Sequence, residues 1–456
     1  MGIIASLKII APMLFYAGGI LLAILAVLGK ARWTLLFLVF LIPLRNILDK
    51  IQQFPAGNQL LDMLIFGMLA SWIFSAGSTT KKFMEKSSLN TIIFFLVMYT
   101  IFSLWIGSAY IEHHAIMVYD DSRVTDAKNF CLLPVVFFLT LNHIQDKKWV
   151  WRVFLVICAA MILMGYYTTT QISEFSSLLS RQKIHGTFQF LGPNEVAAFL
   201  NQYTIILLSV YFYMKRGWPK WFLLGLITLN LYCILFLFSR GAYLGLSIGL
   251  FLLFAFKNRK LLIPLLLILA FWQVVLPEKA IERIKSTHND HGELDESSER
   301  RVKIWEQAFE LFRGSPVFGI GYGVFRSLNL DLGDTHNIYM KLLVEQGVVG
   351  LLIFLVVVVC FMKEGFALYQ KGDDDMSKGL GLGLFICMFV LLGNNMFGDR
   401  WAYFEVSGYL WVFAGLVARL NALSGGAVLP QAIKETAVTR VQATTPHKKI
   451  RKSYYK

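Results

Sequence analysis

Runs of about 20 apolar residues recur along the whole 456-residue chain, and they constrain its fold more than any other feature. A helix needs about 20 such residues to cross a bilayer, whereas a membrane β-barrel would show alternating segments of about ten residues. Only 16% of the residues are charged, against about a quarter in a typical soluble protein. The sequence therefore predicts an all-α polytopic membrane protein.

The apolar runs predict about 12 or 13 transmembrane helices, because two of the runs are short. We expect residues 1–421 to form a single transmembrane domain and the basic residues 422–456 to form a disordered cytoplasmic tail. The longest polar loop between spans is 277–337. The predicted spans are 8–28, 32–44, 58–76, 90–108, 130–144, 149–167, 194–214, 219–238, 241–256, 260–276, 338–362, 379–396 and 401–419.

Basic residues fall in every other loop of this scheme, as in the pairs Lys147/Lys148 and Lys215/Arg216. The loops on that side, with the tail, hold most of the 43 lysines and arginines. Positively charged loops stay in the cytoplasm, so membrane topology explains the net charge of +14, and no nucleic-acid partner is expected. The loop 277–337 then falls on the opposite, periplasmic side.

The stretch "FLFSRGAYLGL" places Arg240 at the junction of two apolar runs. An arginine at membrane depth is costly and tends to be paired or functional. The alternative is an interfacial anchor whose charged end reaches the headgroups. Arg240 is therefore a candidate for binding an anionic substrate.

The stretch "ESSERRVKIWEQAFELF" predicts an amphipathic helix lying on the outer membrane surface. Arg300 and Arg301 would lie near headgroup level, where arginine forks suit phosphate oxygens, although simple headgroup binding is the alternative. The glycine run "SPVFGIGYGVF" follows without the context of a nucleotide-binding loop, so it indicates tight backbone packing or turning. The predicted apolar stripe of the helix is Val302, Trp305, Phe309 and Phe312.

The stretch "GDTHNIYMKLLVEQGVVG" places His336 and Asn337 just before an apolar run, where a histidine can be either a cap or a working group. Arg240, Arg301 and His336 come from three separate segments that topology brings to one side. Two fixed cations and one titratable base suit a phosphate-bearing substrate and proton transfer. Four weaker candidates for substrate binding are Arg300, Asn337, Asn194, which could instead cap a helix, and Arg400, which could pair with Asp399.

No metal site or cofactor is expected from this sequence. The five cysteines lie inside apolar runs without metal-ligand spacing. The acidic run "GDDDMS" lies between cytoplasmic lysines and is interpreted as a solvated loop.

The ordered set "GTFQFLGPNEVAAFL", "SRGAYLGL", "RRVKIWEQAFELFRGSPVFGIGYGVF" and "THNIYMKLLVEQGVVGLLIFL" resembles the superfamily of O-antigen ligases and Wzy-type polysaccharide polymerases. The resemblance covers about residues 181–361. It implies a bacterial inner-membrane glycosyltransferase of lipopolysaccharide or exopolysaccharide biosynthesis, with its active site facing the periplasm. Residues corresponding to Arg240, Arg301 and His336 are regarded as functional in that superfamily.

The resemblance also implies the substrates. The donor would be a glycan linked to undecaprenyl diphosphate, and the arginines would take the place of a metal ion. The acceptor stays open between lipid A core, a growing lipid-linked glycan and a protein Ser or Thr. A chain-length regulator is a possible partner. The rival hypothesis is a transporter or flippase of lipid-linked glycan, but the charge gathers at one face and not along a path through the membrane.

Overall fold

A computed structural model describes residues 2–76, 83–111, 121–175, 177–285, 296–328 and 333–425 of the protein. All regular elements in these residues are helices. Within these residues, eleven helical runs are long and apolar enough to cross a membrane. The predicted all-α polytopic class is confirmed. Residues 286–295 and 329–332 of the long loop, and 426–456 of the predicted tail, lie outside the described residues.

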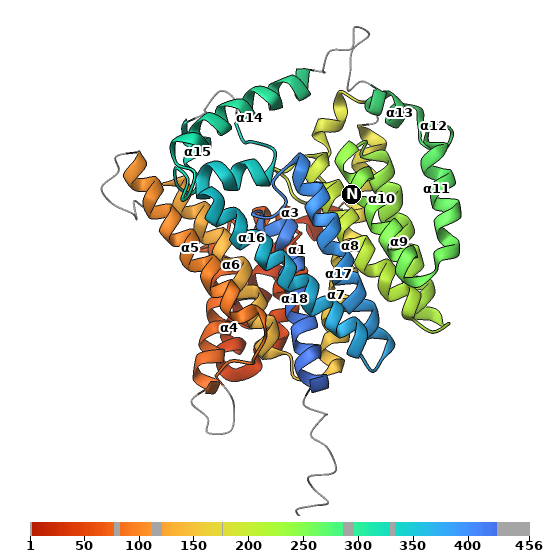
Figure 1. The fold of residues 1–456 in the computed structure, drawn as a ribbon. Coiled ribbons are helices and arrows are strands. Elements are labelled where there is room, and N and C mark those ends of the chain that lie inside the picture. Colours follow the sequence, from red (N-terminus) through yellow and green to blue (C-terminus); the bar gives the residue numbers. More distant parts are fainter. Residues whose placement is uncertain are drawn as a thin grey trace, which may run out of the picture.

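The bundle is built from long helices that run side by side, with shorter ones at its ends and edges (Figure 1). The long helices are α1 (Gly2–Leu25), α2 (Ala31–Leu41), α4 (Leu60–Ala76), α5 (Leu89–Tyr110), α6 (Ser122–His143), α7 (Lys147–Glu174), α8 (Pro193–Tyr213), α9 (Trp218–Phe236), α10 (Arg240–Lys257), α16 (Ile338–Lys371), α17 (Asp375–Asn394) and α18 (Phe404–Gly425). The shorter elements are η1 (Ala26–Lys30), α3 (Arg45–Ile51), η2 (Gly57–Gln59), η3 (Ser180–Lys183), η4 (Arg259–Leu261), α11 (Leu262–Ala270), α12 (Trp272–Val275), α13 (Glu278–Lys285), α14 (Glu296–Gly314), α15 (Val324–Leu328) and η5 (Asn395–Phe397).

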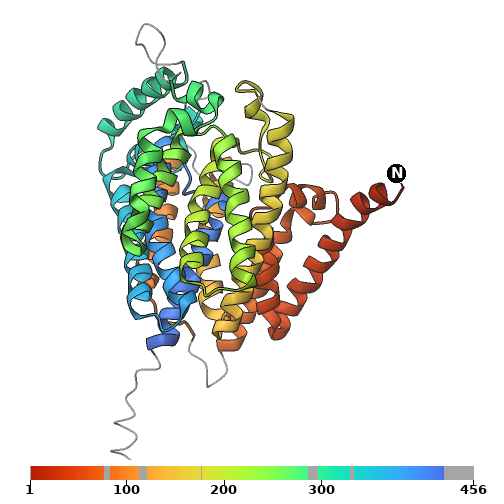
Figure 2. The same cartoon turned by 90° about the vertical axis from the view of Figure 1, so that its right-hand side faces the viewer.

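The first apolar segment folds back on itself. Gly29 adopts a left-handed φ of 83°, and the Thr34 hydroxyl donates to the Leu22 carbonyl over 2.7 Å. Phe15 also stacks on Phe37, with 6.1 Å between the ring centroids. Since α1 and α2 lie antiparallel, the predicted spans 8–28 and 32–44 are two helices of one hairpin, and Figure 2 shows its first helix (red) leaning away from the bundle.

The span predicted at 260–276 is wrong as a continuous helix. The chain breaks at Phe271 into α11 and the four-residue α12, and neither is long enough to cross a membrane. Helix α18 continues to Gly425, past the predicted domain end at residue 421.

The basic loops gather at one end of the bundle, which we call the basic end. Lys147 pairs with Asp374 over 2.6 Å, and Arg419 pairs with Glu85 over 2.8 Å. The first contact joins the start of α7 to the segment before α17, and the second joins α18 to the loop before α5. Helices α13, α14 and α15 lie at the opposite end, which we call the α14 end (Figure 1).

Helices α8, α17 and α18 form the centre of the bundle, and more than 70% of each apolar window is buried. Gly379 and Gly383 of α17 let the backbones of α17 and α8 approach closely, since a Cβ at Gly379 would lie 2.8 Å from the Val210 Cα. The Tyr203 hydroxyl on α8 donates to the Val406 carbonyl over 2.6 Å. This rigid centre carries several of the site residues described below.

The glycine run of residues 319–323 lies against a kink in α16. Gly347 breaks the helix with a φ of 66°, and the freed carbonyls of Val344 and Glu345 accept from the N–H groups of Ile320 and Gly321 over 2.9 and 2.8 Å. Gly321 has a φ of 109°, and a Cβ there would lie 2.1 Å from the Gly107 Cα on α5. The run therefore serves tight backbone packing, as predicted, and it anchors the loop that carries α14.

Candidate active site

An arginine-lined pocket of about 260 Å³ opens at the α14 end. Arg240, Arg301, Arg400 and Asn194 line it, so two of the three principal sequence candidates and two of the weaker ones meet there. Arg283 of α13 is a fourth arginine in the wall. Among the described residues, the lining of this arginine pocket holds four arginines and no carboxylate, which favours an anion.

Three helices begin at this pocket. Arg240 is the first residue of α10, Asn194 lies in the first turn of α8, and Arg301 lies near the start of the described part of α14. The first backbone N–H groups of a helix have no partner within the helix, and its N-terminus carries a partial positive charge. Together with the guanidiniums they form a site that favours phosphate oxygens.

Arg400 is almost fully buried, with 4% of its surface exposed. Its Nη1 pairs with Glu195 Oε1 over 2.9 Å, while its Nε is buried without a hydrogen-bond partner in the described part of the chain. A buried donor without a partner is costly and marks a place where a ligand oxygen would be stabilised. The structure therefore keeps Arg400 as a candidate for substrate binding.

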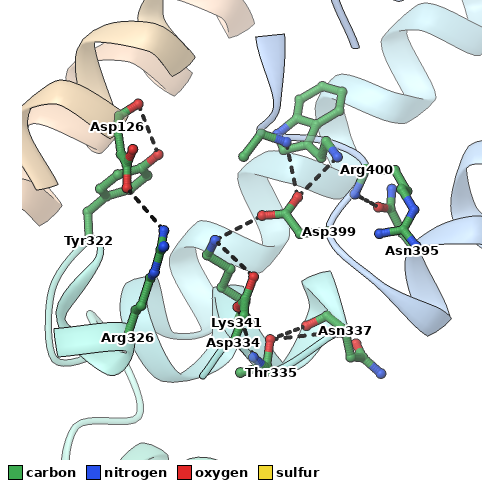
Figure 3. Close-up of polar contacts among 12 residues, drawn as sticks. Asp126, Tyr322, Arg326, Asp334, Thr335, Asn337, Lys341, Asn395, Asp399 and Arg400 are labelled. Carbon is green, nitrogen blue, oxygen red and sulfur yellow. Dashed lines mark hydrogen bonds and ion pairs between the residues drawn. The ribbon is translucent and has the colours of Figure 1, made fainter. Parts of the chain in front are cut away.

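The predicted ion pair between Arg400 and Asp399 is wrong. Asp399 instead accepts from Lys341 Nζ over 2.9 Å and from the N–H groups of Trp401 and Ala402 over 3.1 and 3.0 Å (Figure 3). The adjacent side chains therefore point to different partners, and the Asp399 contacts hold the short loop between η5 and α18 against α16.

Asn194 is not the cap of α8, since Gly192 occupies that position and makes no side-chain cap. The Asn194 Oδ1 accepts from Arg181 Nη2 over 2.9 Å, and Asn194 lines the arginine pocket. Arg181 is buried and also donates to the Leu237 carbonyl over 3.1 Å. Arg181 therefore ties the start of α8 to the loop before Arg240.

His336 lies beside the arginine pocket and does not line it. Its φ of 49° is left-handed, which residues other than glycine rarely adopt, and the residue as a whole is exposed. Partial desolvation lowers the pKa of His336, the Asp334 carboxylate opposes this shift, and Arg301 and Arg400 lower the pKa further. Arg301 and Arg400, which line the arginine pocket, therefore also lower the pKa of His336 and favour its neutral form.

Asn337 caps α16. Its Oδ1 accepts from the N–H groups of Tyr339 and Met340 over 2.9 and 3.2 Å. The cap is thus Asn337, and His336 is the residue before it. This contact gives Asn337 a structural role and leaves its predicted role in substrate binding untested.

Helix α14 packs on the protein through a different stripe from the predicted one. Ile304 and Ala308 are buried against α15 and α16, whereas Val302 and Phe309 are 37% and 43% exposed. The Trp305 Nε1 donates to the Thr335 carbonyl over 2.9 Å, which ties α14 to the segment before His336. Arg301 lies one turn before this inward stripe, while Arg300 is exposed and does not line the pocket.

Residues 223–355, which include Arg240, Arg301 and His336, match the family model described as O-antigen ligase. This part of the chain is similar to the O-antigen ligases. The resemblance predicted from the motifs is confirmed, over a shorter range than residues 181–361. An uncharacterized protein of Haemophilus influenzae is 28% identical over 183 residues, or 34% of this chain and 46% of that protein. The chain therefore matches less than half the length of that curated relative.

The matched residues 223–355 include Arg240, Arg283 and Arg301, while Asn194 and Arg400 lie outside them. Arg283 was missed because nothing in its surrounding sequence separates it from the other cations of the long loop. Glu195, the partner of Arg400, carried a usable signal, since it is an acid at the start of an apolar run. The pocket is completed by elements on both sides of the matched region.

Proposed function

We propose that this protein is a membrane glycosyltransferase that moves a glycan from an undecaprenyl-diphosphate carrier to an acceptor on the periplasmic face of the bacterial inner membrane. The observation that carries the proposal is the pocket of four arginines at three helix N-termini, within and beside an O-antigen ligase domain. The pocket lies at the α14 end, opposite the basic loops. The positive-inside rule places basic loops in the cytoplasm, so it assigns the α14 end to the periplasm.

The diphosphate of the donor binds in the arginine pocket. Arg240 and Arg301 hold the oxygens of the phosphate that departs, and Arg400 offers its unpaired Nε. Fixed guanidiniums stabilise negative charge as it develops on the leaving group, without having to reorganise during the reaction. In this proposal the arginines supply the positive charge that a metal ion supplies in other glycosyltransferases. The polyprenyl chain runs along lipid-facing apolar helices beside the pocket.

The reaction exchanges one bond at the anomeric carbon. A hydroxyl oxygen of the acceptor attacks that carbon, the bond to the diphosphate oxygen breaks, and the electron pair leaves with the diphosphate. The hydroxyl proton passes to the neutral imidazole of His336. Attack from the side opposite the leaving group inverts the anomeric configuration.

The acceptor is a glycan in this proposal, either lipid A core, as for a ligase, or a growing lipid-linked chain, as for a polymerase. Both belong to cell-surface polysaccharide biosynthesis, and the polymerase form would work with a chain-length regulator. A protein Ser or Thr is the alternative acceptor. The match to an O-antigen ligase model supports the ligase or polymerase reaction.

The rival function is a flippase of lipid-linked glycan. Loss of a flippase and loss of a transferase should leave this glycan on opposite faces of the membrane. We expect cells that lack this protein to accumulate undecaprenyl-diphosphate-linked glycan on the outer face of the membrane. The measurement is the fraction of that glycan oxidised by membrane-impermeant periodate in spheroplasts. Accumulation of protected glycan on the inner face would favour a flippase and contradict the transferase.

A further inference from the structure

A second pocket, of about 460 Å³, lies at the α14 end between α3, α4, α6 and the start of α16. We call it the carboxylate pocket. Asp126, Asp334, Glu345 and Asp399 line it together with the rings of Tyr322 and Tyr403. Figure 3 shows how Asp334 and Asp399 converge on Lys341, while Asp126 lies beside Tyr322 and Arg326.

The charges of this pocket do not suit a phosphate. The described residues of its lining include six carboxylates and four cations, and each of these cations lies within 4.0 Å of an acid. Lys341, for example, donates to Asp399 over 2.9 Å, and Lys128 donates to Asp62 over 2.9 Å. A diphosphate would meet net negative charge here and four arginines in the other pocket, so the two pockets select different chemistry.

The lining suits a ligand with many hydroxyl groups. Asp126 is half-exposed and lies 3.8 Å from Arg326, beyond hydrogen-bond distance, so its oxygens can accept from a ligand. Asp334 accepts from the Thr335 N–H and lies 3.9 Å from Lys341, which leaves further lone pairs available. Tyr322 and Tyr403 add flat apolar faces that can pack on the C–H groups of a sugar ring.

The two pockets share short segments of chain. Asp399 lines the carboxylate pocket and its neighbour Arg400 lines the arginine pocket. Asp334 lines the carboxylate pocket, and two residues later His336 lies within the electrostatic reach of Arg301 and Arg400. His336 is therefore two residues from the wall of the carboxylate pocket and within the electrostatic influence of two arginines of the arginine pocket.

We infer that the carboxylate pocket binds the terminal sugars of the acceptor glycan and presents a hydroxyl to His336. Asp126 and Asp334 accept hydrogen bonds from other hydroxyls of those sugars and act as positioning residues. This inference rests on the proposed glycosyltransferase function, and it assigns the acceptor to a site separate from that of the donor.

The test measures binding of two groups of probes to the full chain in lipid nanodiscs. The acceptor probes are core oligosaccharide and repeat-unit oligosaccharide, each released by mild acid, and a Ser/Thr-rich peptide. Geranyl diphosphate serves as the donor probe. The variants are Asp126→Asn and Asp334→Asn, and the control is Glu310→Gln, an exposed acid on α14 outside both pockets.

We expect one of the two oligosaccharides to bind wild type, and each aspartate variant to weaken that binding about tenfold, because a hydrogen bond to a charged group is lost. Affinity for geranyl diphosphate should stay within about twofold, as should both affinities of Glu310→Gln. Asp126 is exposed at the surface, so its variant tests the inference even if Asp334→Asn folds poorly.

Three results would overturn the inference: neither oligosaccharide binds wild type, the aspartate variants bind it normally, or the peptide binds in its place. The oligosaccharide that binds tells a core acceptor from a growing chain. If the oligosaccharide binds as expected but wild type transfers no glycan to it, the proposed function fails while the sugar site stands.

Discussion

Replacing Arg301 with alanine is expected to lower kcat for glycan transfer about 10²- to 10³-fold, because the leaving diphosphate loses a fixed cation that acts as its charge develops. Arg301 lies on the inward side of α14 and lines the arginine pocket. Arg301→Lys keeps the charge but loses the planar fork, so its activity should lie between those of alanine and wild type. The measurement is single-turnover transfer from undecaprenyl-diphosphate-linked oligosaccharide.

The matched control for this prediction is Arg313→Ala on the same helix. Arg313 is exposed, and its guanidinium lies over the ring of Phe309, 4.8 Å from the centroid. The control should keep nearly full activity, since it removes a cation of α14 without touching the pocket. Equal losses in the two variants would mean that α14 supplies only general positive charge.

Replacing His336 with asparagine is expected to lower kcat about 10²- to 10⁴-fold, the range in which general-base catalysis contributes. Asparagine is chosen because it tolerates the left-handed backbone of this position better than alanine, so the fold should survive the change. If the asparagine variant has the same melting temperature as wild type and keeps most of its activity, His336 is excluded as the base.

The same assignment fixes a pH dependence for wild type. A general base works when neutral, and desolvation with Arg301 and Arg400 holds the pKa of His336 below its ordinary value of 6.5, against Asp334 and Glu195. Activity should therefore persist at pH 6.5 and fall only as the pH drops through that lower pKa. Asp334→Asn should move this acid limb of kcat to still lower pH, since the carboxylate raises the pKa. An acid limb above pH 7, or no change in Asp334→Asn, would contradict the assignment.

The fold class could be predicted because span length and loop charge follow directly from the bilayer. The errors arose where packing decides. Residues 260–276 are apolar enough for a span, yet the chain turns at Phe271 to place α13 over the arginine pocket. On α14 the larger side chains suggested one stripe, but the helix packs through Ile304 and Ala308 because α16 offers a close surface there.

The candidate site was predicted in part. Arg240 and Arg301 could be found because a charged residue at a span junction or on an amphipathic helix stands out from its surroundings, and the pocket brings both together. The pairing of Arg400 with Glu195, and of Asp399 with Lys341, could not be predicted, since each partner comes from a distant segment. These pairs form because the fold buries the two partners side by side, and the spacing of the residues in the sequence does not indicate this.

The most direct measurement is glycan transfer by the purified full chain in proteoliposomes, with undecaprenyl-diphosphate-linked oligosaccharide and a chelator present. Lipid A core and a second donor molecule would be offered as competing acceptors. Our account predicts a new glycosidic product of inverted configuration, formed by wild type and lost in Arg301→Ala and His336→Asn. Movement of the donor across the bilayer without any joined product, or full activity in both variants, would contradict it.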